Sequence, residues 1–275
     1  MKIVVALVTL LSRVYLGNGQ RAVTFLEPTC GVSLSTIHFK VMGGQTANMF
    51  ANPWMALILS DIICGGSLIT DRFVLTAGHC ISHQPAVVHL GDFNRSTTAQ
   101  YCSRTACMPR AIKIPVVAQI SHPRFVNPAY NDIALFRLAW RVQFTDFIRP
   151  ICLLTNYDPL PQMRFFTVSG WGETEHGTGS DVLKTTNLEQ VDRSKCLIYG
   201  RRIDLSHICA GDRASGVCRG DSGGPVHGTF MINGRTRVVQ VGLVSYGDHD
   251  CRSWSVLTNV MYHMNWIAYT VGQVQ

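Results

Sequence analysis

The sequence has few charges, no long apolar run and no basic block. Only 15% of its 275 residues are charged, for a net charge of +7. Without a cluster of lysines and arginines, nucleic-acid binding has little support. The apolar run at residues 3–11 is too short to cross a bilayer, which takes about 20 residues, and no later stretch resembles a membrane span. With 47% hydrophobic residues the chain is not disordered, and it can bury a core in one large domain or two small ones.

The first residues predict secretion. Met1 and Lys2 precede the apolar run at 3–11, which is the pattern of a secretory signal peptide. Ser12 and Arg13 end the run early, so we expect the signal peptide at 1–17, with cleavage after Gly17 or Gly19. The mature protein is then expected to be secreted and extracellular, with no membrane contact.

The sequence contains ten cysteines. An even number behind a secretory signal favours a disulfide framework formed in an oxidising compartment. A metal site is disfavoured, because the spacings do not resemble those of zinc-ligand pairs. The spacings by themselves leave the pairing of the ten cysteines open.

Residues 220–225, Gly-Asp-Ser-Gly-Gly-Pro, combine three glycines with a carboxylate and a hydroxyl, so they do not suit a hydrophobic core. As a plain structural motif they would form a turn. The chemical interpretation is that Ser222 is a nucleophile that needs a histidine beside it to take its proton. The N–H groups of Gly220 and Ser222 would then bind the oxyanion of a tetrahedral intermediate.

The partners that such a serine needs occur upstream. Thr-Ala-Gly-His-Cys occupies 76–80 and Asn-Asp-Ile-Ala-Leu occupies 131–135, which gives the chain order His79, Asp132, Ser222. In this order and these motifs the chain resembles the trypsin/chymotrypsin family of serine endopeptidases, from about Val41 to its C-terminus. The resemblance implies that His79 is the general base and that Asp132 orients it.

The resemblance also implies the fold. The family is all-β, with two six-stranded antiparallel Greek-key barrels, an active site between them and a C-terminal helix. Short apolar or alternating runs between turn residues agree with strands, and apolar residues at helical spacing predict a helix over 261–271. The runs lie at 54–60, 66–70, 73–76, 87–90, 167–170, 238–246 and 255–259.

Residues 39–44, Phe-Lys-Val-Met-Gly-Gly, resemble the family's activation junction. Cleavage after Lys40 would free the α-amino group of Val41 to pair with the Asp221 carboxylate and order the oxyanion hole. We therefore expect a zymogen with a propeptide or light chain at 18–40 and a catalytic domain at 41–275. The chain resembles arthropod clip-type cascade proteases, but residues 18–40 are too short for a clip domain.

By the same resemblance, three disulfides are expected in the catalytic domain and one more ties residues 18–40 to it. A fifth would close a small surface loop like those of clip-type proteases. The expected pairs are Cys64–Cys80, Cys196–Cys209, Cys218–Cys251, Cys30–Cys152 and Cys102–Cys107.

The expected substrate pocket departs from that of trypsin. Gly216 stands six residues before Ser222, where trypsin-type enzymes carry an aspartate. With Val217 and Ser255 as its other members, the pocket is expected to be neutral and to accept apolar or aromatic side chains, although acidic residues at 248–250 could supply a charge from the rim. Ser245 is expected beside the buried aspartate, and Tyr246 and Gly247 would pair with the substrate backbone. Such an enzyme would not cut after its own Lys40, so a different, trypsin-like protease must activate it.

Asn94 begins the one glycosylation sequon, Asn-Arg-Ser. We expect no cofactor and no metal. The main hypothesis is a monomeric secreted serine endopeptidase of an immune or developmental cascade, with protein substrates, a trypsin-like activator and protein inhibitors as partners. A digestive enzyme would share the same chemistry. The alternative from another class is a non-catalytic homologue that binds partners, which the intact motifs disfavour.

Overall fold

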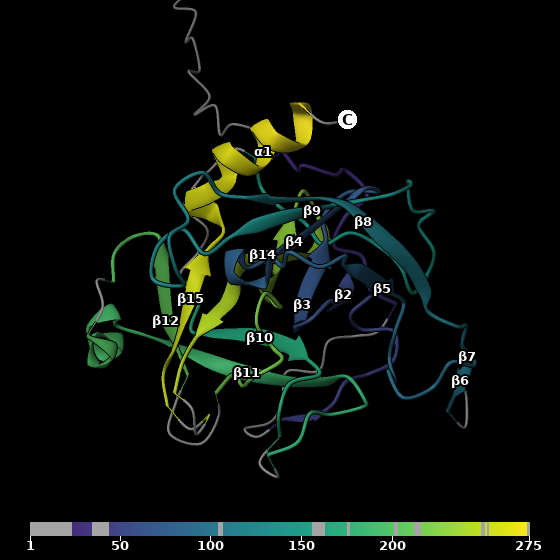
Figure 1. Cartoon of the computed structure of the whole chain (residues 1–275), viewed down its shortest axis with the longest axis horizontal. Coiled ribbons are helices and arrows are strands. Elements are labelled where there is room, and N and C mark those ends of the chain that lie inside the picture. Colours follow the sequence, from purple (N-terminus) through teal and green to yellow (C-terminus); the bar gives the residue numbers. More distant parts are fainter. Residues whose placement is uncertain are drawn as a thin grey trace, which may run out of the picture.

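The computed structural model describes residues 24–34, 44–103, 107–155, 163–174, 177–200, 203–211, 216–248, 251 and 253–273. The expected signal peptide and the Lys40–Val41 junction lie outside these residues. None of the helices in the described ranges is long and apolar enough to cross a membrane. Figure 1 shows strands filling the body of the molecule, with the C-terminal α-helix lying along its top edge.

Six antiparallel strands close into the first barrel. Its interior is filled by buried apolar side chains such as Ile58, Val74 and Phe136, as expected when inward and outward side chains alternate around a small barrel. In barrel order the strands are β2 (Met55–Leu59), β3 (Ile63–Leu68), β4 (Phe73–Thr76), β9 (Ala134–Leu138), β8 (Ile112–Ser121) and β5 (Val87–Leu90).

The second barrel also has six antiparallel strands, and a pairing between β11 and β12 closes it. A short strand, β1 (Gln45–Thr46), adds to β11 from outside. The all-β, two-barrel fold predicted from the sequence is therefore confirmed. The strands are β10 (Phe165–Gly170), β11 (Lys184–Val191), β12 (His207–Ala210), β13 (Pro225–Ile232), β14 (Arg235–Tyr246) and β15 (Ser255–Asn259).

The two barrels share one apolar cluster, so they pack as a single body. Trp54 and Leu57 of the first barrel and Leu243 of the second belong to this cluster. The C-terminal helix α1 (Met264–Gln273) adds its buried side chains Met264, Ile267 and Val271 to the same cluster. The shared core fixes the position of one barrel against the other, which a site built from both barrels requires.

The short elements lie in the connections between strands. The hairpin of β6 (Tyr101–Cys102) and β7 (Cys107–Met108) projects from the first barrel (Figure 1). The described residues also form three 3₁₀ helices: η1 (Gly78–Cys80), η2 (Arg193–Tyr199) and η3 (Met261–His263). Asp192 caps η2 by accepting from the Ser194 N–H at 2.8 Å, and Gly200 ends it in a left-handed conformation.

Five disulfides join the ten cysteines, in the pairs expected above. The pair Cys64–Cys80 ties β3 to η1, and Cys102–Cys107 closes the β6–β7 hairpin. The pair Cys30–Cys152 links residues separated by 122 positions. The N-terminal segment 24–34 is thereby bonded covalently to the body.

Main-chain pairing also holds segment 24–34 in place. Leu26 donates to the Leu153 carbonyl at 3.0 Å, and Gly31 donates to the Pro150 carbonyl at 2.8 Å and accepts from Val238 at 3.0 Å. Gly31 has a φ of +67°, and a Cβ there would lie 2.6 Å from both Cys152 Sγ and the Val238 carbonyl oxygen. Only glycine fits this position without strain.

We expect Gly31→Ala to lower the free energy of unfolding by about 2 to 5 kcal/mol, since a left-handed alanine costs roughly 1–2 kcal/mol and overpacking roughly 1–3. Gly200→Ala is the matched control, because Gly200 has a φ of +64° and open space around it. Gly200→Ala should lose only the roughly 1–2 kcal/mol that a left-handed alanine costs. Thermal or denaturant unfolding of both variants measures the difference, and equal losses would show that Gly31 is not tightly packed.

Candidate active site

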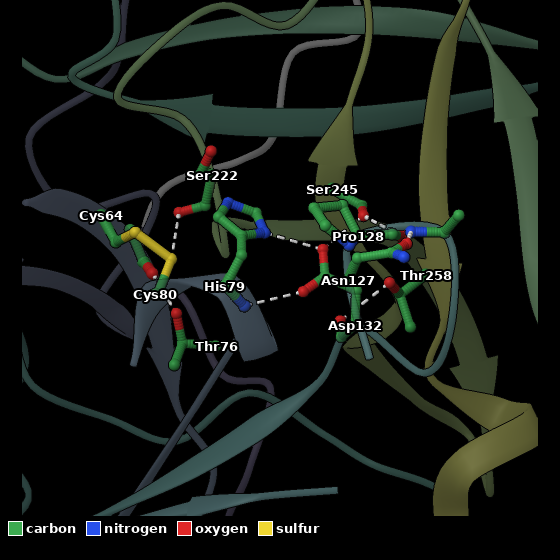
Figure 2. Close-up of polar contacts among 12 residues, drawn as sticks. Cys64, Thr76, His79, Cys80, Asn127, Pro128, Asp132, Ser222, Ser245 and Thr258 are labelled. Carbon is green, nitrogen blue, oxygen red and sulfur yellow. Dashed lines mark hydrogen bonds and ion pairs between the residues drawn. A yellow bond between two sulfur atoms is a disulfide. The ribbon is translucent and has the colours of Figure 1, made fainter. Parts of the chain in front are cut away.

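His79, Asp132 and Ser222 come from the ends of different elements. His79 lies in η1 directly after β4, Asp132 precedes β9, and Ser222 lies shortly before β13. The first two residues therefore belong to the first barrel and the third to the second barrel. Figure 2 shows the imidazole of His79 between Asp132 on one side and Ser222 on the other.

Asp132 holds His79 through two hydrogen bonds. Its Oδ1 accepts from the His79 backbone N–H at 2.9 Å, and its Oδ2 lies 2.8 Å from His79 Nδ1. The Asp132 side chain is 1% exposed, whereas that of His79 is 24% exposed. Because a carboxylate only accepts, the proton of the neutral imidazole lies on Nδ1 and Nε2 keeps a lone pair. A histidine held in this tautomer can take a proton on the side away from Asp132.

Two residues of the second barrel hold Asp132 in turn. Ser245 on β14 donates its hydroxyl proton to Asp132 Oδ2, and Thr258 on β15 donates to the Asp132 carbonyl oxygen at 2.9 Å. Ser245 was expected near the aspartate from the sequence. Thr258 was not identified there, since a single threonine inside an apolar strand gives no sign of what it contacts.

The loop of Ser222 is shaped by its glycines. Gly223 has a φ of +75°, and a Cβ there would lie 2.1 Å from Thr76 Oγ1. Gly223 also donates to the Val244 carbonyl at 2.8 Å, and the Ser222 carbonyl accepts from Gly65 at 2.8 Å. The main chain around Ser222 is thus hydrogen-bonded to both barrels, through Gly65 in the first and Val244 in the second. The turn interpretation of residues 220–225 is thus correct locally, and the turn presents a serine.

The candidate oxyanion donors are the N–H groups of Gly220 and Ser222. Gly220 has a φ of +92°, which favours glycine. Within the described part of the chain, neither N–H group donates to a backbone carbonyl, whereas the intervening Asp221 N–H donates to Cys218 at 3.1 Å. The two N–H groups that flank Asp221 are therefore the candidate donors to an incoming acceptor. The structure shows no hydrogen bond between Ser222 Oγ and His79 in its described residues.

The Asp221 carboxylate lies against Gly170 and Gly172, where there is no room for a side chain. Its Oδ1 accepts from Gly172 at 2.9 Å, and its Oδ2 accepts from Cys218 at 3.1 Å. A Cβ on Gly170 would lie 2.1 Å from Oδ1. Burial raises the pKa of Asp221 to about 6, although the two backbone hydrogen bonds act in the opposite direction. No lysine or arginine pairs with Asp221 in the described residues.

The residues expected to form the pocket are small and uncharged. Ser255 is 1% exposed and Val217 is 5% exposed, and the Val217 N–H donates to Ser255 Oγ at 3.5 Å. A Cβ on Gly216 would lie 2.6 Å from the Cys251 carbonyl oxygen, and the Cys218–Cys251 disulfide joins these two walls. Tyr246 and Gly247 follow Ser245 at the end of β14. Of the acidic rim expected at 248–250, Asp248 is described, while 249–250 lie outside the described residues.

Two further sequence features are placed by the structure. The side chains of Cys64, His79 and Cys80 lie within 4.8 Å of one another, but both sulfurs are bonded in a disulfide and cannot act as thiolate ligands. The partly exposed Asn94 accepts from the Ser96 hydroxyl at 2.7 Å. Its main chain forms a bridge to Val182 in the second barrel.

Known proteins are similar to this chain over most of its length. The Trypsin family model matches residues 41–267. Melanization protease 1 of Drosophila melanogaster is 35% identical over 90% of this chain and 68% of that protein. The CLIP domain-containing serine protease HP8 of Bombyx mori is 36% identical over 90% of this chain and 73% of that protein.

A solved structure is also similar. The crystal structure of the Drosophila Grass clip serine protease of the Toll pathway superimposes with a TM-score of 0.74 at 30% identity, covering 88% of this chain and 74% of that one. The family resemblance predicted from the sequence is confirmed. The chain belongs to the trypsin family of serine endopeptidases and is of the type found in insect protease cascades.

Proposed function

We propose that this protein is a secreted zymogen whose activated form hydrolyses peptide bonds through His79, Asp132 and Ser222. The observation that carries the proposal is the buried Asp132 bound to His79 Nδ1 at 2.8 Å, with Ser222 on the opposite side of the ring (Figure 2). This arrangement leaves Nε2 as the base nearest to the serine.

The proposed reaction proceeds in two halves. Ser222 Oγ attacks the scissile carbonyl while His79 Nε2 takes its proton, and the N–H groups of Gly220 and Ser222 stabilise the oxyanion. His79 then gives the proton to the leaving amine, and a covalent acyl-enzyme remains on Ser222. Water activated by the same histidine attacks the acyl group and releases the acid. Asp132 stabilises the imidazolium that forms in each half.

Activation is proposed to follow cleavage between Lys40 and Val41. The support lies at Asp221, a carboxylate with a pKa raised by burial and with no basic side chain beside it in the described residues. The new α-amino group of Val41 would supply the cation and fix the loop that carries Gly220. Strand β1, which starts four residues after Val41, already pairs with β11 of the second barrel. The bonded segment 24–34 would remain attached as a light chain.

The pocket is proposed to be neutral. Val217 and Ser255 offer no charge to pair with a substrate guanidinium, and a buried unpaired cation is strongly disfavoured. We therefore expect cleavage after apolar or aromatic side chains, and activation by a separate trypsin-like protease. A melanization protease and a phenoloxidase-activating enzyme of Bombyx mori, which is 34% identical, support a role in an extracellular insect cascade with protein substrates. Protein inhibitors are proposed as further partners. The same relatives disfavour a purely binding homologue.

The test is to cleave the purified chain after Lys40 and assay matched peptide amides that end in Phe, Ala or Arg. We expect turnover after Phe or Ala to exceed turnover after Arg by at least about tenfold, which is the discrimination expected from 1–3 kcal/mol in a pocket. Ser222→Ala, cleaved in the same way, should show none. Turnover after Arg alone would refute the neutral pocket, and no turnover by the folded, cleaved protein would favour the binding homologue.

A further inference from the structure

The main chain of Asp132 is hydrogen-bonded to a residue 126 positions away. The Thr258 hydroxyl donates to the Asp132 carbonyl oxygen at 2.9 Å across the boundary between the barrels (Figure 2). Thr258 is 2% exposed and Asp132 is 1% exposed, so water does not compete for this bond. A buried hydrogen bond of this kind contributes more to geometry than an exposed one.

The main chain at Asp132 needs this support because it lies outside the strand ladder. Asp132 precedes β9, whose pairing with β4 and β8 begins at Ala134. The preceding Asn131 adopts a left-handed φ of 51°, so the chain turns sharply just before the carboxylate. In the described residues, the hydrogen bond to the Asp132 carbonyl comes from Thr258.

Thr258 is a rigid donor. It lies on β15 between two partner strands, opposite His207 of β12 and Leu243 of β14. Side chains that are mounted on a central strand hold a site more accurately than those on loops. The second barrel therefore forms two hydrogen bonds with Asp132. Ser245 donates to its carboxylate, and Thr258 donates to its main-chain carbonyl.

We propose that Thr258 is a positioning residue for catalysis, which sets the Asp132 carboxylate against His79 by fixing the Asp132 carbonyl. This inference rests on the proposed function of the triad. It assigns to Thr258 a contribution to turnover beyond its contribution to folding, since a shift of Asp132 rotates or displaces the imidazole that must reach Ser222. Substrate binding at the pocket is left unchanged, because Thr258 bonds to Asp132 and not to the pocket wall.

The experiment compares three variants of the cleaved protein. Thr258→Val keeps the shape and removes the hydroxyl, Thr258→Ser keeps the hydroxyl, and Ser67→Ala is the control. Ser67 donates to Gln240 Oε1 at 2.6 Å, which is another fully buried bond between the barrels but one that includes no residue of the triad. The three variants thus separate the loss of any interbarrel bond from the loss of the bond to Asp132.

We expect Thr258→Val to lower kcat about tenfold with little change in KM, and Thr258→Ser to restore it to within about threefold, on the scale of one hydrogen bond. Ser67→Ala should lower the melting temperature similarly but leave kcat unchanged. An unchanged kcat in Thr258→Val, or an equal fall in Ser67→Ala, would overturn the inference.

A second readout does not depend on turnover. The proton NMR resonance of His79 Nδ1–H reports its hydrogen bond to Asp132, and it should shift in Thr258→Val but not in Ser67→Ala. If the wild-type protein proves inactive, the proposed function fails while this resonance still tests the positioning role. An unshifted resonance in Thr258→Val would overturn that role.

Discussion

Asp132→Asn is expected to lower kcat of the cleaved protein by about 10⁴. The substituted amide can present an N–H to His79 Nδ1, which then becomes an acceptor and leaves the proton on Nε2. In that tautomer the imidazole cannot take the Ser222 proton. The His79 backbone N–H, which donates to Asp132 Oδ1 at 2.9 Å, can still bond to the amide oxygen, so the fold should survive.

Steady-state kinetics on the best peptide amide, with circular dichroism as a check of folding, measure this effect. The control is Asp71→Asn, which removes a surface ion pair with Arg141 and should change kcat less than about twofold, because exposed pairs contribute little. A folded Asp132→Asn protein within tenfold of wild type would mean that Asp132 does not set the tautomer of His79.

The second large effect is expected at Asp221. In cleaved protein, Asp221→Asn should displace the Gly220 N–H from the oxyanion site. We expect kcat to fall by about 10²–10³, which is the loss seen when one oxyanion donor is removed. The substitution should also remove most of the stability gained on cleavage, because separating a buried ion pair costs about 3–5 kcal/mol. Comparing the melting temperatures of cleaved and uncleaved protein, for wild type and variant, measures the gain. Asp146→Asn, which loses a surface pair with Arg149, is the control.

The uncleaved protein gives a matching prediction in pH. Burial raises the pKa of Asp221 from 3.8 to about 6, so between these values the folded chain holds a proton that the unfolded chain has lost. The contribution of Asp221 to the free energy of unfolding therefore falls as the pH rises from about 4 to 6. The uncleaved Asp221→Asn protein should lack this decline.

In the cleavage experiment, a gain in melting temperature on cleavage that persists in Asp221→Asn would exclude Asp221 as the partner of the new terminus.

The strand pattern located several elements because short apolar or alternating runs lie between turn residues. Runs at 73–76, 87–90 and 255–259 coincide with β4, β5 and β15. The run at 66–70 was misplaced, since β3 spans Ile63–Leu68. Cys64, Gly65 and Gly66 resemble a turn in sequence, yet a Cβ on Gly65 would lie 3.0 Å from Gly224. Contact between the barrels, and not local preference, favours glycine in that strand.

The candidate triad could be proposed from sequence because three motifs in one order carry the chemistry. The residues that hold the triad in place could not all be predicted in this way. Ser245 was inferred by resemblance, but Thr258 and Gly65 act through main-chain atoms of distant residues, Asp132 and Ser222. Main-chain contacts leave little trace in residue type, so only the fold reveals them.

The most direct test of the account is irreversible labelling with a fluorophosphonate before and after cleavage at Lys40, with the labelled residue identified by mass spectrometry. We expect about one equivalent of label on Ser222, only after cleavage, and none in His79→Ala. No label on correctly folded and cleaved protein, or label on a different residue, would contradict the claim that Ser222 is the activated nucleophile.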